Sequence, residues 1–497
     1  MRRTPRWYAL ALVALLSAAV AAAEDAAKAP ATPPEEPTPP SVKDLLKVIE
    51  AQRAELEKQL EALRKQNDAI DAQAEQIAKL EAALLAVQNQ IQEMQNRPEV
   101  VSIDQALEER LKKLELGLEQ VPEISEVVSA GDFPGSIRIP GTDAAIKIGG
   151  QVRATLVENL EALGVDDRFV TAAIPIEGTE EAGKGSRLTM SARASRFNFD
   201  FRTPTSVGAM RAFLEADFAG TGNVLRLRHA FGRWRRWLLG QTWSTFSDPE
   251  AEPEGIDFEG LNAIALLRQM QVRYTWEYEE RKFLAVAMED PLCSVDGPAE
   301  CVSQFPAIVV RLRVEQPKWI RGAGHYQVAA LLRALRAEPS TSPNDVRGAR
   351  GWALSASGSL ALAFLPDGDT VQFAGYLGEG YGSYITDLAA EGGQDAVFDG
   401  GDDDLQPLPA LGAYLGYDHE WSERWASTAT VGIVRVDNLD IQPIDAYKRT
   451  ERYSANIRWQ PVPRLFVIAE LLAGKRVNKD GQRGTSSQIQ VGARFLF

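Results

Sequence analysis

The feature that most constrains this chain is a change in the period of its hydrophobic residues. From Ile146 to Phe497, apolar side chains tend to recur at every second position, and the polar side chains between them include many arginines. A period of two is that of a β-strand, whose successive side chains point to opposite faces. The region therefore predicts an all-β domain whose strands carry one apolar face and one strongly polar face.

The connections between these strands separate a membrane barrel from a soluble sandwich, which alternates in the same way. We expect about sixteen antiparallel strands, joined alternately by tight turns such as Glu279–Arg281 and long loops such as Gly378–Leu408. Outer-membrane barrels have short periplasmic turns, long outer loops and an even number of strands. The pattern predicts an all-β transmembrane barrel over residues 146–497. The first strand should begin, and the last strand should end, on the periplasmic side.

Aromatic residues support a barrel in the outer membrane. Tryptophans gather at predicted strand ends, for example Trp234, Trp276 and Trp459, where interfacial girdles flank the apolar band of a barrel. The last strand ends at Phe497, and a terminal aromatic strand resembles the signal that the barrel-assembly machinery reads. Expected partners are this machinery, outer-membrane lipid and lipopolysaccharide.

The first 40 residues predict export. Residues 1–23 combine arginines, a short apolar run from Tyr8 to Leu16 and the small residues Ala21–Ala23, which is the pattern of a cleaved signal peptide. The run falls short of the ~20 apolar residues that span a bilayer as a helix. A Pro-rich spacer is expected over residues 24–40. Export predicts the outer membrane of a Gram-negative bacterium as the location.

Residues 41–120 predict an α-helical coiled coil. Seven apolar residues fall at intervals of seven: Ile49, Leu56, Leu63, Ile70, Ile77, Leu84 and Ile91. A sustained seven-residue repeat indicates a left-handed coiled coil. Residues 121–145 are then a linker to the barrel. We expect the coiled coil to lie in the periplasm and to join barrels into an oligomer, and peptidoglycan is a possible partner for it.

Composition and motifs argue against several other classes. A net charge of −15 disfavours a nucleic-acid partner. His229, His325 and His419 are far apart in strand patterns, and we find no nucleophile elbow and no Gly-rich phosphate loop. We expect no enzyme, cofactor or metal. Cys293 and Cys301 lie in a turn-rich stretch, and in an oxidising compartment such a pair predicts a disulfide rather than a metal site.

The segment from Leu188 to Gly260 carries a family resemblance. It contains the phrases SRFNFDFRTPTSVG, FLEADFAG, LRLRHAFG and LLGQTWSTFSDPEAEPEGIDFEG. These phrases resemble the DcaP-like family of trimeric outer-membrane porins. The resemblance implies a sixteen-stranded barrel per subunit, a homotrimer and passive uptake of small anions such as dicarboxylates. The chain departs from the family at a basic turn, Arg233–Arg236, and at an acidic loop, Gly392–Asp404.

The polar strand faces predict the lining of a pore. Arginine stays charged and binds carboxylates bidentately, so several arginines in a narrow lumen concentrate anions. The alternative is that these arginines only hold the barrel wall together by pairing with Glu215, Asp217, Glu277 and Glu315. The expected pore-lining residues are Arg193, Arg196, Arg202, Arg226, Arg228, Arg273, Arg311 and Arg313.

Two acidic loops are expected to behave differently. The loop Ser247–Leu266 follows the fifth strand, and we expect it to fold into the barrel and to form a constriction opposite the arginines. A solvated outer loop is the alternative. Its acidic residues are Asp248, Glu250, Glu252, Glu254, Asp257 and Glu259. The Gly/Asp-rich loop Asp387–Asp404 is expected to be solvated and disordered, with a divalent-cation site as the alternative.

These observations favour a porin that lets small hydrophilic solutes diffuse passively, with a preference for anions of the dicarboxylate type. A phosphate-selective porin is one alternative, although it favours lysine rows where this chain has arginine. The other alternative is a structural envelope tether or adhesin with a non-conducting barrel.

Overall fold

The computed structural model describes residues 130–317, 324–342 and 345–497. The predicted signal peptide, spacer and coiled coil, and most of the linker, lie outside these residues. Within them, no helix has the length and apolarity needed to cross a bilayer. The description below therefore concerns the β-domain.

Sixteen strands form the wall of this domain. Each pairs antiparallel with its neighbour in the chain, and the last pairs with the first, as in Leu156 opposite Val491. The strands are β2 (Ala145–Asn159), β4 (Arg196–Thr203), β5 (Met210–Asp217), β6 (Arg226–Trp234), β7 (Trp237–Trp243), β8 (Arg268–Glu279), β9 (Lys282–Glu289), β12 (Ala307–Glu315), β13 (His325–Pro339), β14 (Arg347–Leu360), β15 (Thr370–Glu379), β18 (Pro409–Ser422), β19 (Trp425–Val436), β20 (Tyr447–Val462), β21 (Leu465–Asn478) and β22 (Arg483–Leu496).

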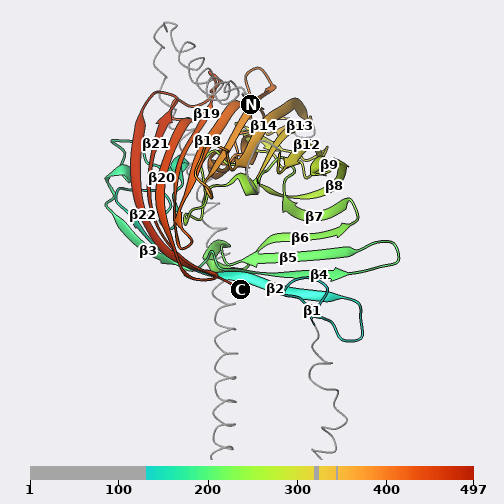
Figure 1. The fold of residues 1–497 in the computed structure, drawn as a ribbon. Coiled ribbons are helices and arrows are strands. Elements are labelled where there is room, and N and C mark those ends of the chain that lie inside the picture. Colours follow the sequence, from blue (N-terminus) through green and yellow to red (C-terminus); the bar gives the residue numbers. More distant parts are fainter. Residues whose placement is uncertain (1–129, 318–323, 343–344) are drawn as a thin grey trace, which may run out of the picture. The chain divides into compact units, whose positions relative to one another are not determined.

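The predicted sixteen-stranded antiparallel barrel is confirmed. In Figure 1 the cyan β2 meets the red β22, where the barrel closes. Closure leaves no unpaired edge, which a sheet in lipid requires because the bilayer core offers no water to its backbone groups. The short strand β3 (Arg187–Ser191) pairs with the end of β2, and a turn over residues 192–195 separates it from β4.

The outward face matches the predicted apolar face. Exposed side chains such as Val152, Leu239, Met270 and Leu471 alternate with buried ones along their strands. Exposed tryptophans lie near the tight turns, as Trp421 and Trp425 do around the β18–β19 turn. We call the barrel end with these short turns the turn end, and the opposite end the loop end.

Loops at the loop end carry the remaining secondary structure. L1 (residues 160–186) contains η1 (Thr171–Ala173) and η2 (Glu181–Gly183), and L3 (residues 244–267) contains η4 (Pro249–Ala251). L4 (residues 290–306) contains β10 (Val295–Asp296) and β11 (Ala299–Cys301), and Cys293 and Cys301 form a disulfide in it. L6 (residues 380–408) contains η5 (Gly382–Tyr384), α5 (Thr386–Ala390), β16 (Ala396–Asp399) and β17 (Asp404–Pro407). Elsewhere β1 (Ile137–Arg138) pairs with β2, and η3 (Thr221–Asn223) follows β5.

The largest hydrophobic core lies on the inner face of the barrel. Small apolar residues of the wall, such as Ala329, Ala353 and Ala374, pack against Tyr384 and Leu388 of L6. L3 adds further members to this core: Phe246, Leu261, Ala263, Ile264 and Ala265. The prediction that every strand has a strongly polar inner face is therefore wrong for this side. There, loops rather than water cover the wall.

Candidate pore constriction

L3 leaves the wall after β7 and is fixed across the barrel interior at its start. The carboxylate of Asp248 accepts a hydrogen bond from Ser357 Oγ at 2.7 Å and lies 2.9 Å from His325 Nε2. Arg313 Nη1 lies 3.3 Å from the same carboxylate. These partners belong to β14, β13 and β12, and Asp248 is only 1% exposed. Asp248 thus anchors the loop rather than facing a solute.

The middle of L3 is fixed to the opposite wall. Asp257 pairs with Arg452 of β20 at 2.8 Å, and the backbone N–H groups of Ile256 and Asp257 donate to Glu470 of β21. Glu254 pairs with Arg494 of β22 at 2.6 Å. Because L3 is anchored to both sides of the wall, it lies inside the barrel. The alternative that this segment is a solvated outer loop is therefore wrong.

A cavity of about 520 Å³ lies between L3 and the strands around β2, β4, β6 and β8. Its lining carries more positive than negative side chains. The arginines are Arg153, Arg168, Arg196, Arg226, Arg228, Arg268, Arg452 and Arg494. The carboxylates are Glu252, Glu254, Asp257, Glu259 and Glu470. We call this space the constriction cavity.

Some of these arginines form ion pairs with acidic residues of the barrel wall, which is the alternative given above for the predicted pore-lining arginines. Arg226 and Arg228 both approach Asp217 to 2.8 Å, and Arg228 also approaches Glu215 to 2.8 Å. Arg196 lies farther from Glu215, at 3.8 Å. For Arg226 and Arg228, the charge offered to a solute is therefore partly cancelled within the wall.

Arg153 and Arg268 differ from the other six, since neither has a carboxylate within 4.0 Å among the residues that the structure describes. Arg153 is 8% exposed, and its Nε and Nη2 are buried without a hydrogen-bond partner. The guanidinium of Arg268 lies 4.7 Å from the ring centroid of Trp243. Among the eight arginines of the lining, these two lack a close counter-charge.

Sequence reasoning missed both residues, for different reasons. Arg153 shares the polar face of β2 with Gln151, so strand alternation was a signal that could have identified it. Arg268 is adjacent to Gln269 and has the phase of the lipid-facing Met270, so alternation places it outside. Its position in the cavity lining is therefore one that strand alternation does not predict.

The eight predicted pore-lining arginines lie in several places. Only Arg196, Arg226 and Arg228 line the constriction cavity. Arg193 pairs instead with Asp167 of L1 at 2.8 Å, and Arg202 pairs with Asp200 at 2.7 Å near the turn end. The other three line a separate cavity of about 810 Å³ at the turn end: Arg273, Arg311 and Arg313.

The six predicted acidic residues of L3 also divide. Asp248 is an anchor, and Glu250 pairs with Arg313. The remaining four line the constriction cavity: Glu252, Glu254, Asp257 and Glu259. Glu259 lies 3.1 Å from Arg168, and burial raises the pKa of its carboxyl to about 7 in spite of this cation.

The acidic loop L6 is folded, so the expectation of a solvated, disordered loop is wrong for its buried part. Asp395 is fully buried and pairs with Arg333 of β13 at 2.9 Å. Asp387 is 2% exposed and accepts hydrogen bonds from Thr171 Oγ1 at 2.7 Å and Tyr447 Oη at 2.9 Å. No group of three possible metal-ligating side chains occurs in the described part of the chain.

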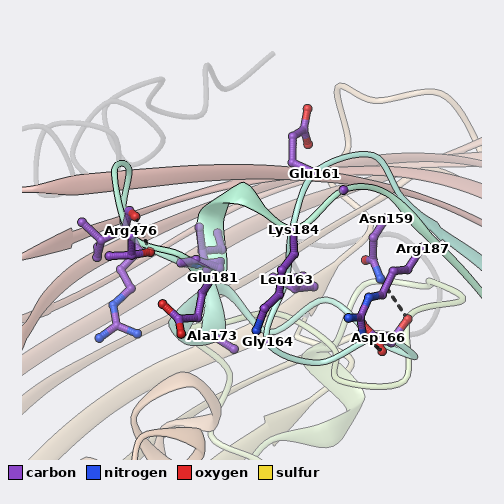
Figure 2. A pocket seen from close by; sticks show the side chains of 16 residues that line it. Asn159, Glu161, Leu163, Gly164, Asp166, Ala173, Glu181, Lys184, Arg187 and Arg476 are labelled. Carbon is purple, nitrogen blue, oxygen red and sulfur yellow. Dashed lines mark hydrogen bonds and ion pairs between the residues drawn. The ribbon is translucent and has the colours of Figure 1, made fainter.

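A smaller cavity of about 340 Å³ lies beneath L1 (Figure 2). Several of its charged side chains are already paired. Arg187 lies 2.9 Å from Asp166, and Arg476 lies 3.0 Å from Glu391. Its floor is partly apolar, with Leu163 and Ile174. These pairings leave little net charge for a ligand, so we assign no site there.

The three histidines have structural partners. His229 lies 3.0 Å from Thr242 Oγ1, and His419 lies 2.9 Å from Asp369. Ser357, Asp248 and His325 lie together, but the carboxylate lies between the other two. The hydroxyl therefore donates to a carboxylate rather than to imidazole, which is not the arrangement of a catalytic triad.

Comparisons with known proteins identify the family. The model of the DcaP outer membrane protein family matches residues 66–497. The outer membrane channel DcaP of Acinetobacter baumannii is similar in fold, with a TM-score of 0.63 and 21% sequence identity over 71% of this chain and 97% of that one. OmpT of Vibrio cholerae has a TM-score of 0.43 and 12% identity over 71% and 98% of the two chains. No curated protein sequence matches the chain.

The family match covers the whole barrel and most of the chain. The barrel closure and the internal L3 are consistent with it. The chain belongs to the DcaP outer membrane protein family, and it has the fold of an outer-membrane channel.

Proposed function

We propose that this outer-membrane channel is a porin that passes small anions by passive diffusion, with dicarboxylates as its preferred class. The observation that carries the proposal is the constriction cavity, where eight arginines face five carboxylates. Charges in a narrow lumen with low-dielectric walls act more strongly than in open water, because little solvent screens them. The net positive lining then attracts anions and repels cations.

The apolar packing of L3 and L6 supports a route along the arginine-bearing wall. Because Ala329, Ala353 and Ala374 are covered by loop residues, water and solutes have less room on that side. A solute is directed instead past Arg153 and Arg268, whose guanidiniums have no carboxylate of the described residues within 4.0 Å. Weak binding at several positions lets an anion enter without being trapped.

The two alternatives make different predictions. A phosphate-selective porin favours lysine rows, but the lining of the constriction cavity contains no lysine. A tether or adhesin with a non-conducting barrel requires no uncompensated charge inside, which Arg153 and Arg268 supply. Both observations favour the anion porin.

The test is a planar-bilayer measurement of the purified full-length protein in a KCl gradient. We expect a reversal potential that indicates anion preference, and we expect the double variant R153Q/R268Q to lower the chloride-to-potassium permeability ratio several-fold. The matched control is R193Q, which removes an arginine that is paired outside the cavity. A cation-preferring wild type contradicts the proposal, and an absence of conductance favours the tether.

We further propose that the chain is a homotrimer with a periplasmic coiled coil over residues 41–120. OmpT of Vibrio cholerae has been solved in a trimer form. Phe497 exchanges backbone hydrogen bonds with Gly150 where the last strand meets the first, and its side chain is exposed at the turn end. This position is consistent with its proposed role as a signal for the assembly machinery. Deleting residues 41–120 is expected to weaken trimers, or attachment to peptidoglycan, without closing the pore. Cross-linking and cell-wall co-sedimentation measure these effects.

A further inference from the structure

The separate cavity at the turn end has a charge pattern that the constriction does not explain. Its volume is about 810 Å³, and its lining includes Arg235 and Arg236 of the unusually basic β6–β7 turn. It shares no lining residue with the constriction cavity. The helix η4 lies between the two cavities, because Glu250 lines one and Pro249 lines the other.

Five of the six arginines in this cavity have no salt bridge to any carboxylate in the described part of the chain. Two of the five belong to the β6–β7 turn, and the other three lie on strands: Arg233, Arg273 and Arg311. We call these three the arginine row. Arg233 is opposite Leu238 on the neighbouring strand, and Leu238 is opposite Arg273. Arg311 is opposite Ala285, which is fully buried.

The residues between these arginines are short or apolar, so they offer no counter-charge. The Nε atom of Arg311 is buried without a hydrogen-bond partner. A buried donor that lacks a partner costs free energy, and a bound anion would remove this cost.

The glutamates of the same lining already have partners. Glu250 and Glu315 both pair with Arg313. Glu279 pairs with Lys282, Glu280 lies 3.8 Å from Arg281, and Glu277 accepts the backbone N–H of Arg281 at 3.1 Å. No glutamate of the lining forms a salt bridge with the arginine row, so no direct contact neutralises the row.

We propose that the arginine row is a second anion site, on the turn side of L3, for a compact oxyanion with two or more negative charges. Several guanidiniums can share such an anion through forked hydrogen bonds, which offsets their mutual repulsion. The site deepens the proposed function, on which it rests. Arg268 and Arg273 are five residues apart on β8, or roughly 16 Å along a strand. A solute that leaves the constriction then meets a second weak site.

The test uses inorganic pyrophosphate as a blocker of the full-length trimer in planar bilayers, added to each side in turn. We expect the double variant R273Q/R311Q to weaken block at least tenfold when pyrophosphate is added on the side of the turn end. Block from the side of the loop end should weaken less than twofold. The matched control is R281Q/R424Q, which removes two charges from tight turns at the same barrel end, neither of which lines the cavity. An equal loss in the control, or no loss in R273Q/R311Q, overturns the proposal.

Three further measurements separate this site from the rest of the protein. Heat-modifiable migration in gels verifies that each variant folds, and R273K/R311K retains charge but loses the forked geometry, so we expect it to recover block only partly. Repeating the experiment with succinate shows whether the row prefers phosphates or dicarboxylates, according to which anion loses more block in R273Q/R311Q.

The outcomes for the two proposals are distinguishable. If the wild type shows no anion preference in the KCl gradient but pyrophosphate block remains side-specific and sensitive to R273Q/R311Q, the proposed function fails and the arginine row stands. If anion preference is present and block is insensitive to R273Q/R311Q, the arginine row fails and the proposed function stands.

Discussion

The two sides of the barrel interior differ in the residues that they turn toward the lumen. On the side formed by β20 to β22 and β2 to β8, the inner face carries arginines and carboxylates around a cavity. From β13 to β15, the inner face carries alanine and leucine, and L3 and L6 cover it. The outward face is apolar on both sides because lipid requires it. The residue types of the inner face therefore depend on what contacts it: charged residues face water, and small apolar residues face a packed loop.

The largest expected effect comes from breaking the packed side. Substituting Asp395→Asn leaves the buried guanidinium of Arg333 without its charge partner. Removing one member of a buried ion pair typically costs about 3–5 kcal/mol. We expect L6 to detach first, so the variant should be cleaved by protease in L6 and unfold at a lower temperature than wild type.

The control for this variant is Asp402→Asn, an exposed position in the same loop. It should change the unfolding temperature by little. If Asp395→Asn and Asp402→Asn behave alike, the packing of L6 does not depend on the buried pair.

A smaller effect is expected at the disulfide of L4, which borders the packed side. Replacing both Cys293 and Cys301 with serine opens a short covalent loop. Chain-entropy arguments give roughly 2–3 kcal/mol for a loop of this length. Because β11 still pairs with β13, we expect local opening of L4 with the barrel retained. Hydrogen exchange should increase in residues 290–306, and a general increase across the barrel would contradict this expectation.

The smallest expected effect sharpens the charged side. The pKa of Glu259 is about 7, so its carboxyl takes up a proton as the pH falls through that value. Protonation leaves Arg168 less compensated and makes the cavity more positive. Anion preference should therefore rise modestly between pH 8 and pH 6, measured as a shift in reversal potential. Burial also raises the pKa of Glu252 in the same lining to about 7, so E259Q should reduce the pH dependence and E252Q/E259Q should abolish it. An unchanged pH dependence in the double variant would assign it to another group.

Much of the fold could be predicted from the sequence, because lipid requires apolar side chains at every second position of a membrane strand. Each of the sixteen predicted strands corresponds to an observed one, although the ends move. A long loop is predicted over Ala337–Arg350, for example, but β13 extends to Pro339 and β14 begins at Arg347. The site was less predictable. Arg193 was placed correctly on the inner face but pairs with Asp167, since L1 folds back over it.

The sequence by itself determined the barrel, its strand number and the family, because alternation, turn spacing and the C-terminal strand are local patterns that the membrane enforces. Only the tertiary structure decided which inner-face arginines share a cavity. Neutralisation depends on contacts across the lumen, such as Asp257 with Arg452, between residues distant in the chain. It also decided that one side of the interior is packed, because L3 and L6 must fold inward before small wall residues become a core.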